Sequence, residues 1–216
     1  MIIYLLGVHG SGKTSLIENL RSELPVTKIL NLDLNPKIVK STNPSAANQQ
    51  LRHSDYFDNL TPELKKHPEH IILIDRAPFS LNVYDRTFKE IKTITNKEYE
   101  YLKKDYDDRL KRFKQQLNVS GHSEYYVYLN TPIDQVKLNI IKRGRNRNLN
   151  EEDWRYLETV YKEYGKEIIK LKPDQTLTLE WDSNKSVIDN YDWWGRVLSV
   201  MIKKLNRGFF SATVRA

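Results

Sequence analysis

Residues 7–14 read GVHGSGKT and match the pattern G-x-x-x-x-G-K-[ST]. The apolar run 2–6 (IIYLL) precedes this stretch, and a segment with helical spacing, SLIENLRSEL, follows it, which is the context that the pattern requires. In that context backbone amides and the helix N-terminus surround the β- and γ-phosphates, Lys13 supplies a positive charge, and the Thr14 hydroxyl can bind Mg²⁺. The sequence therefore predicts a nucleoside-triphosphate site formed by Gly7, Val8, His9, Gly10, Ser11, Gly12, Lys13, Thr14 and Ser15. The pattern does not specify the side chain of His9, so we expect it to fill space.

The remaining chain alternates between short apolar runs and longer segments with helical spacing. Besides 2–6, the runs 28–32, 71–74, 125–129 and 176–181 are short enough for strands, and 97–118 and 151–171 have apolar residues at steps of three and four. Such alternation is typical of βαβ crossovers. We expect an α/β fold with a five-stranded parallel sheet flanked by helices.

Two helix starts carry local signals. Thr95 is followed three residues later by Glu98, which predicts a capping box at the start of the 97–118 helix. Thr131 and Pro132 similarly predict the start of a helix after the 125–129 strand.

Composition limits the class of protein. The chain has 216 residues, a formal net charge of +7 and no cysteine, so we expect one domain over 1–216 and an anionic partner, and we exclude disulfides and thiolate chemistry. No apolar run approaches the roughly 18 residues of a membrane span, and the N-terminus lacks the basic start of a signal peptide. We therefore expect a cytoplasmic protein with no membrane partner.

The stretch 71–80, IILIDRAPFS, ends an expected strand with two opposite charges. The carboxyl ends of parallel strands meet at one edge of the sheet, so Asp75 and Arg76 should lie beside the phosphate loop. There Asp75 can hold or orient Mg²⁺, and Arg76 can bind an acceptor or the transferring phosphoryl group. The alternative is an ion pair that closes a turn.

The segment 142–147, KRGRNR, places three arginines on a polar stretch between two helices. A short lid at about 142–151 could bring Arg143, Arg145 and Arg147 to the phosphates and exclude water.

A guanine-reading N-K-x-D is missing after the later strands, because Asn96 and Lys97 continue as Glu-Tyr. The residues thus favour a phosphoryl-transfer enzyme over a signalling GTPase.

Taken together, these stretches resemble the deoxyribonucleoside kinase family, within the wider superfamily of P-loop nucleoside and thymidylate kinases. The resemblance covers most of 1–170 in the same order and includes VYLNTPIDQVKLNIIKRGRNRN, which is similar to the family's fourth strand and lid. In the family the third strand ends in an acidic residue, Arg and a small residue, followed by an aromatic-Ser pair and later a Glu-Tyr. The corresponding residues here are Asp75, Arg76, Ala77, Phe79, Ser80, Glu98 and Tyr99.

The resemblance implies an ATP- and Mg²⁺-dependent kinase that phosphorylates the 5′-hydroxyl of a deoxynucleoside. It implies that Arg76 lies near the acceptor's 5′ end, and that a carboxylate after the second strand is the general base. Asn35 stands where the family has a glutamate, so Asp33 is the nearest candidate base and Asp75 is the alternative.

For the acceptor, the resemblance implies a base-reading Gln in NQQLRHSDYF, an expected helix. Either glutamine of this stretch could face inward. The candidate substrate-binding residues are Gln49, Gln50, Arg52, Tyr56, Arg76 and Phe79. The loop 182–186 matches the family's adenine site or is a plain turn.

Two alternatives stay open. A thymidylate-like monophosphate kinase would use Lys37, Lys40 or Arg52 for a second phosphate, and a polynucleotide kinase or nucleic-acid-binding ATPase would use the basic surface. We expect a small-molecule substrate rather than nucleic acid. The family is often dimeric, and exposed apolar residues on 79–91 would support a homodimer.

Overall fold

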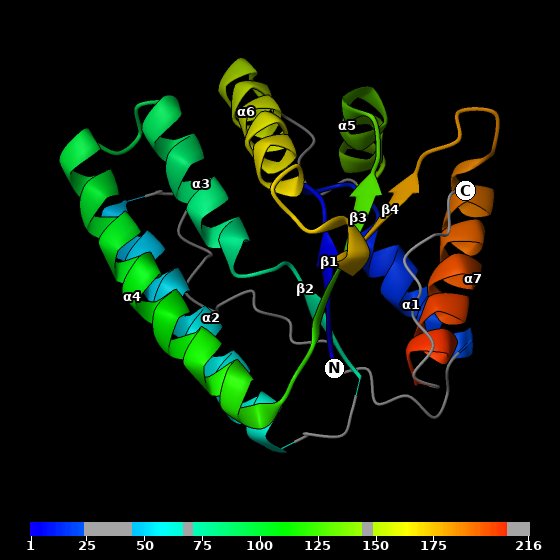
Figure 1. Ribbon diagram of the computed structural model, residues 1–216. Helices are drawn as coiled ribbons and strands as arrows, with labels where there is room; N and C mark the ends of the chain where they lie inside the picture. Colours follow the sequence, from blue (N-terminus) through cyan, green and yellow to red (C-terminus); the bar gives the residue numbers. More distant parts are fainter. Residues whose placement is uncertain (24–44, 67–70, 144–148, 207–216) are drawn as a thin grey trace.

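The computed structural model describes residues 1–23, 45–66, 71–143 and 149–206. Within them, four parallel strands form one sheet in the order β2-β1-β3-β4 (Figure 1). The strands are β1 (Ile2–Leu6), β2 (Ile72–Asp75), β3 (Glu124–Asn130) and β4 (Thr176–Glu180). The sequence predicted five strands; the described sheet has four, because the run 28–32 lies outside the described residues.

Seven α-helices and one short 3₁₀ helix surround this sheet in the described part of the chain. They are α1 (Lys13–Glu23), α2 (Ala46–Lys66), α3 (Phe79–Glu90), α4 (Asn96–Ser120), α5 (Ile133–Lys142), α6 (Glu151–Ile168), η2 (Pro173–Gln175) and α7 (Val187–Asn206). The strands and helices expected from the sequence are all present where the structure describes the chain, with ends that differ by a few residues.

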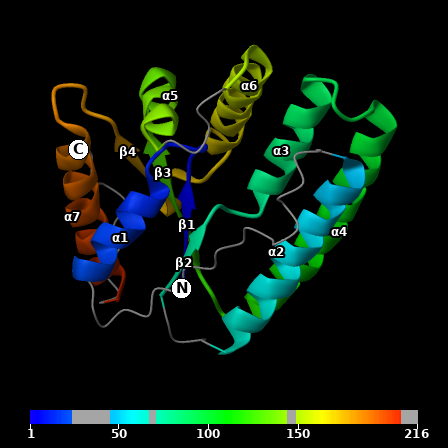
Figure 2. The same ribbon diagram turned by 180° about the vertical axis from the view of Figure 1, so that it is seen from behind.

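The central strand β1 is buried along its whole length, which explains why it reads as a continuous apolar run. Successive side chains point to opposite faces, so Ile3 and Leu5 pack with α1 and α7, while Tyr4 and Leu6 pack with α2 and α4. Figure 2 shows these helix pairs on opposite sides of the sheet. Both faces are therefore covered.

The predicted capping box at the start of α4 is confirmed. The Glu98 amide donates to Thr95 Oγ1, and the Thr95 amide donates to the Glu98 carboxylate at 2.7 Å. Gly121, at φ 67°, ends the same helix in the left-handed region. A second capping box, Asn150 with Asp153, opens α6.

The predicted start of a helix after β3 is confirmed, but Thr131 does not cap it. The helix α5 begins directly after Pro132 and has no side-chain cap, and the Thr131 hydroxyl donates to the backbone oxygen of Ser11, 3.0 Å away. The residue thus connects the end of β3 to the phosphate loop.

No described helix is long and apolar enough to cross a membrane.

Candidate functional site

The GVHGSGKT stretch turns sharply between β1 and α1. Its three glycines have positive φ angles, and Gly12 has the least room: a Cβ atom there would lie 2.2 Å from Cε1 of Tyr191 on α7. A residue other than glycine would be strained by its φ of 99° and would also collide with this ring. The glycine pattern therefore reflects packing against α7 as well as the turn itself.

Lys13 lies over this loop and is only 5% exposed. Its Nζ donates to the backbone oxygens of Gly7, at 2.8 Å, and Val8, at 2.9 Å. Burial lowers the pKa of Lys13 to about 8; Asp75 opposes this shift, while Arg76 and Arg143 add to it. The lysine is held in place, but its positive charge is poorly compensated.

Two side chains outside the motif, one on α5 and one on α7, contact the loop. The buried Asn139 of α5 donates from Nδ2 to the Gly10 oxygen at 2.9 Å and to the Tyr191 hydroxyl at 3.3 Å. Tyr191 in turn stands against Gly12. Sequence reasoning missed Asn139 and Tyr191, since both lie more than 120 residues from the loop and carry no local signal.

Asp75 and Arg76 emerge at the carboxyl edge of the sheet, as predicted. Asp75 Oδ1 lies 3.9 Å from Lys13 Nζ and is buried without a hydrogen-bond partner among the described residues. Asp75 pairs with Leu5 in the β1–β2 register, so the end of β2 stands beside the start of the phosphate loop. The two stretches singled out from the sequence therefore form one site.

Arg76 is held by its backbone in an unusual conformation. Its φ is +78°, its amide donates to the Leu5 oxygen at 2.9 Å, and its carbonyl accepts from the Tyr56 hydroxyl at 3.0 Å. Such strain costs about 1–3 kcal/mol and tends to cluster at functional sites. Tyr56, a candidate substrate-binding residue, is thus placed as a support of Arg76.

The guanidinium of Arg76 faces two rings. Its Cζ lies 5.2 Å from the centre of the Tyr84 ring, and one terminal nitrogen lies 3.1 Å from Nδ1 of His9. Burial disfavours the charge, but Tyr84, Asp75 and nearby tyrosines outweigh it and raise the pKa of Arg76 above its ordinary value. The guanidinium therefore keeps its charge.

The helix α2 settles which glutamine faces inward. Gln49 is 1% exposed, its Oε1 accepts from Arg52 at 3.3 Å, and its Nε2 is buried without a partner in the described chain. Gln50 instead donates to the Tyr101 hydroxyl at 2.8 Å on the exposed side of α4. Gln49 is thus the buried glutamine of this stretch, whereas Gln50 forms its hydrogen bond at the surface.

Arg52, which donates to Gln49, lies on the same side of α2. Burial lowers the pKa of Arg52, Tyr156, Tyr84 and Asp85 raise it, and Arg76 lowers it further. Arg52 thus lies within electrostatic range of Arg76. The helix α2 brings an amide and a guanidinium to the side of the site that Arg76 faces.

A buried histidine between two carboxylates was not expected from the sequence. Nε2 of His53 lies 2.8 Å from Asp85 on α3, and Nδ1 lies 3.1 Å from Asp105 on α4. Asp105 also accepts from Arg109 at 3.0 Å. Burial raises the pKa of Asp85, whereas its hydrogen bond to His53 lowers it. The cluster thus joins α2, α3 and α4.

The other candidates fall into three groups. Phe79 is half-buried at the start of α3, where its ring lies 6.1 Å from Tyr164 in the core. Thr14 is exposed in the first turn of α1, and Arg143 is exposed at the end of α5. The predicted lid is described only at its two ends: Arg145 and Arg147, like the candidate base Asp33, lie outside the described residues.

The 182–186 loop is a well-anchored turn. The buried Asn190 accepts from the Asp182 amide at 2.9 Å and donates to the Asp182 oxygen at 2.9 Å. These hydrogen bonds explain the conformation of the turn. Whether the loop binds adenine stays a prediction.

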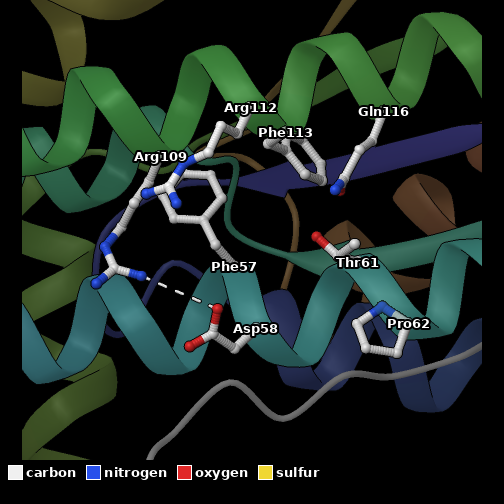
Figure 3. A pocket seen from close by; sticks show the side chains of 8 residues that line it. All are labelled: Phe57, Asp58, Thr61, Pro62, Arg109, Arg112, Phe113 and Gln116. Atoms are coloured by element: carbon white, nitrogen blue, oxygen red, sulfur yellow. Dashed lines mark ion pairs between the residues drawn. The ribbon is translucent and has the colours of Figure 1, made fainter.

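A surface pocket of about 240 Å³ opens between α2 and α4 (Figure 3). It lies away from the phosphate loop, and none of its lining residues is a predicted site residue; they are Phe57, Asp58, Thr61, Pro62, Arg109, Arg112, Phe113 and Gln116. The candidate site is instead the edge of the sheet where Lys13, Asp75 and Arg76 meet.

Comparisons with known proteins bear on the fold and the family of the chain. Three solved structures of a deoxyadenosine kinase from M. mycoides are similar in fold. The structure with the products dCMP and a flexible dCDP has a TM-score of 0.65 and 17% identity over 93% of this chain and 100% of the other. The structure with dCTP has a TM-score of 0.64 and 18% identity, over 96% of this chain and 100% of the other. The structure with dATP has a TM-score of 0.64 and 17% identity, over 95% of this chain and 100% of the other.

No curated protein matches the chain. The profile of the deoxynucleoside kinase family, however, matches residues 3–198. The match includes β1 except for Ile2, the phosphate loop, Asp75, Arg76 and α2. The chain therefore belongs to the deoxynucleoside kinase family.

Proposed function

We propose that this protein transfers the γ-phosphoryl group of ATP to the 5′-hydroxyl of a deoxynucleoside. The observation that carries the proposal is the meeting of donor and acceptor elements at one edge of the sheet. Lys13 of the phosphate loop lies 3.9 Å from Asp75, and Arg76, the next residue, reaches His9 of the same loop. A hydroxyl bound at Arg76 would therefore face a triphosphate bound at Lys13.

In this proposal the chain acts by positioning and by charge. The 5′-oxygen attacks the γ-phosphorus, the bond between this phosphorus and the bridging oxygen breaks, and ADP leaves. Loop amides and Lys13 bind the phosphates, and Arg76 and Arg143, with Arg145 and Arg147 from the lid, stabilise the charge of the transferring group. The hydroxyl proton passes to a carboxylate, for which Asp75 and Asp33 are the candidates.

The donor set at this edge fits Mg²⁺, which prefers oxygen ligands. Asp75 offers a buried carboxylate oxygen without a hydrogen-bond partner in the described chain, and Thr14 offers an exposed hydroxyl at the start of α1. We propose that these two residues hold the ion directly or through water. Bound there, Mg²⁺ would neutralise charge on the phosphate oxygens.

For the acceptor, we propose that Gln49 and Arg52 of α2 read the base. Gln49 has a buried Nε2 with no partner among the described residues, and a buried polar group normally has one. A nucleobase edge that accepts from this Nε2 would satisfy it. A monophosphate acceptor is the alternative, although Lys37 and Lys40, the candidates for its phosphate, lie outside the described residues.

The test is a panel of deoxynucleosides and deoxynucleoside monophosphates incubated with ATP and Mg²⁺, with products separated by chromatography. We expect a nucleoside monophosphate as product from at least one deoxynucleoside and no product from Lys13→Ala. Lys103→Ala is the matched control, because within the described residues Lys103 forms its salt bridge with Asp107 on the exposed face of α4. Phosphorylation of monophosphates alone would favour the thymidylate-like alternative, and full activity in Lys13→Ala would refute the donor site.

We also propose that the reaction takes place within one domain, in the cytoplasm. A homodimer remains a prediction that light scattering can test. Exposed apolar residues on 79–91 would support it. Among the described residues, however, none of the large exposed apolar side chains lies on α3, which packs against α4 and α6.

A further inference from the structure

His9 occupies a loop position whose side chain the phosphate-binding pattern leaves open. The residue lies between Gly7 and Gly10, which have φ angles of 138° and 83°. The residue reaches the surface of the molecule, and the centre of its ring lies 6.0 Å from that of Tyr84 on α3. The side chain thus leaves the loop toward α3.

There His9 meets Arg76. The same terminal nitrogen of Arg76 lies 3.1 Å from Nδ1 and 3.4 Å from Nε2 of the ring. Arg76 forms no salt bridge within the described residues, and its Nε is buried there without a hydrogen-bond partner. Apart from the face of Tyr84, the imidazole is therefore the side chain that fixes this guanidinium within the described chain.

An imidazole can accept from a guanidinium only when it is neutral. The groups that face His9 favour that state: Arg76, Lys13 and Arg52 are cationic, and Tyr84 is neutral below its ordinary titration range. Desolvation by the surrounding protein, together with these three charges, lowers the pKa of His9 well below its ordinary value. The ring is consequently an acceptor at neutral pH.

We propose that His9 is a positioning residue that holds the guanidinium of Arg76 toward the phosphate loop, so that the acceptor and donor halves of the site are aligned. The inference rests on the proposed function and adds to it a direct link between the two halves. His9 touches Arg76 rather than the reacting atoms, so its loss should disturb the geometry of transfer more than nucleotide binding.

The first experiment compares His9→Ala and His9→Gln with the unaltered protein. We expect His9→Ala to lower kcat about tenfold to a hundredfold, since a misplacement of about 1 Å can have that effect. Binding of a fluorescent ATP analogue should change by less than about twofold. His9→Gln should recover most of the rate, because its amide oxygen can still accept from Arg76. His122→Ala, at the opposite end of the sheet, controls for loss of a histidine.

A double-mutant cycle with Arg76→Ala decides the route of the effect. If His9 acts through Arg76, adding His9→Ala to Arg76→Ala should cost little further rate. Additive losses would overturn the inference, as would an unchanged kcat in His9→Ala or a loss of ATP binding as large as the loss of rate. An unaltered protein inactive on every acceptor would instead refute the proposed function, so the two failures are distinguishable.

Discussion

The unusual environment of Lys13 predicts that nucleotide binding depends on pH between 7 and 9. Burial is the largest cause of its lowered pKa of about 8, and the neighbouring charges of Arg76 and Arg143 add to it. The amine is therefore mostly charged at pH 7 and mostly neutral at pH 9. A bound triphosphate requires the ammonium form, because the amine then faces several negative oxygens.

The size of the effect follows from this pKa. A group with a pKa of about 8 is neutral in about one tenth of molecules at pH 7, one half at pH 8 and nine tenths at pH 9. If binding restores the charge, the Kd for the nucleotide should rise about twofold at pH 8 and about tenfold at pH 9, relative to acid conditions. Complex formation at pH 8 should take up about half a proton.

Isothermal titration calorimetry measures this uptake directly. Binding of a non-hydrolysable ATP analogue with Mg²⁺ is followed at pH 8 in two buffers of different ionisation enthalpy. The phosphates themselves titrate near pH 6, and burial lowers the pKa of His9 well below its ordinary value, so neither group titrates near pH 8. Lys13→Ala should show no uptake of this kind. A Kd constant from pH 7 to pH 9, with no proton uptake, would refute the argument that burial discharges Lys13.

Three further predictions concern other parts of the site. Gln49→Ala should raise the KM for the deoxynucleoside about tenfold or more while Gln50→Ala leaves it unchanged, and equal effects in steady-state kinetics would contradict the inward placement of Gln49. His53→Ala leaves the buried Asp85 without its ion-pair partner, while Asp105 keeps Arg109, and should reduce the free energy of unfolding by about 3–5 kcal/mol in urea titrations; a change below about 1 kcal/mol would contradict it. Gly12→Ala should abolish nucleotide binding, because its Cβ would meet the Tyr191 ring, and Gly12→Ala with near-normal affinity in the calorimeter would show that this ring can move aside.

Local patterns made the phosphate loop and the strand ends predictable. The apolar run 2–6 fixes β1, the pattern at 7–14 fixes the turn after it, and parallel topology then places Asp75 and Arg76 at the same edge. Each of these steps needs only neighbouring residues and one rule of topology. The expected fifth strand at 28–32 lies outside the described residues, so the described sheet does not test it.

Contacts between distant elements could not be predicted in the same way. Periodicity indicates that NQQLRHSDYF is helical, but only the packing of α2 against α4 shows that Gln49 is inside and Gln50 is outside. The same holds for Asn139 and Tyr191, whose hydrogen bonds join α5, α7 and the loop. Polar residues of this kind look like surface residues in a sequence, because their partners lie on other elements.

The charges of the candidate site support the proposal that it binds a triphosphate. Arg76 and Arg143 both lower the pKa of Lys13, and Arg76 also lowers those of His9 and Arg52. Asp75 is the carboxylate that opposes the shift at Lys13. Cations gathered in this way repel one another in the free protein, and burial reduces the screening that water would provide. A triphosphate supplies the negative charges that these side chains lack. The cations that repel one another in the free protein should therefore bind the donor and stabilise the transferring group.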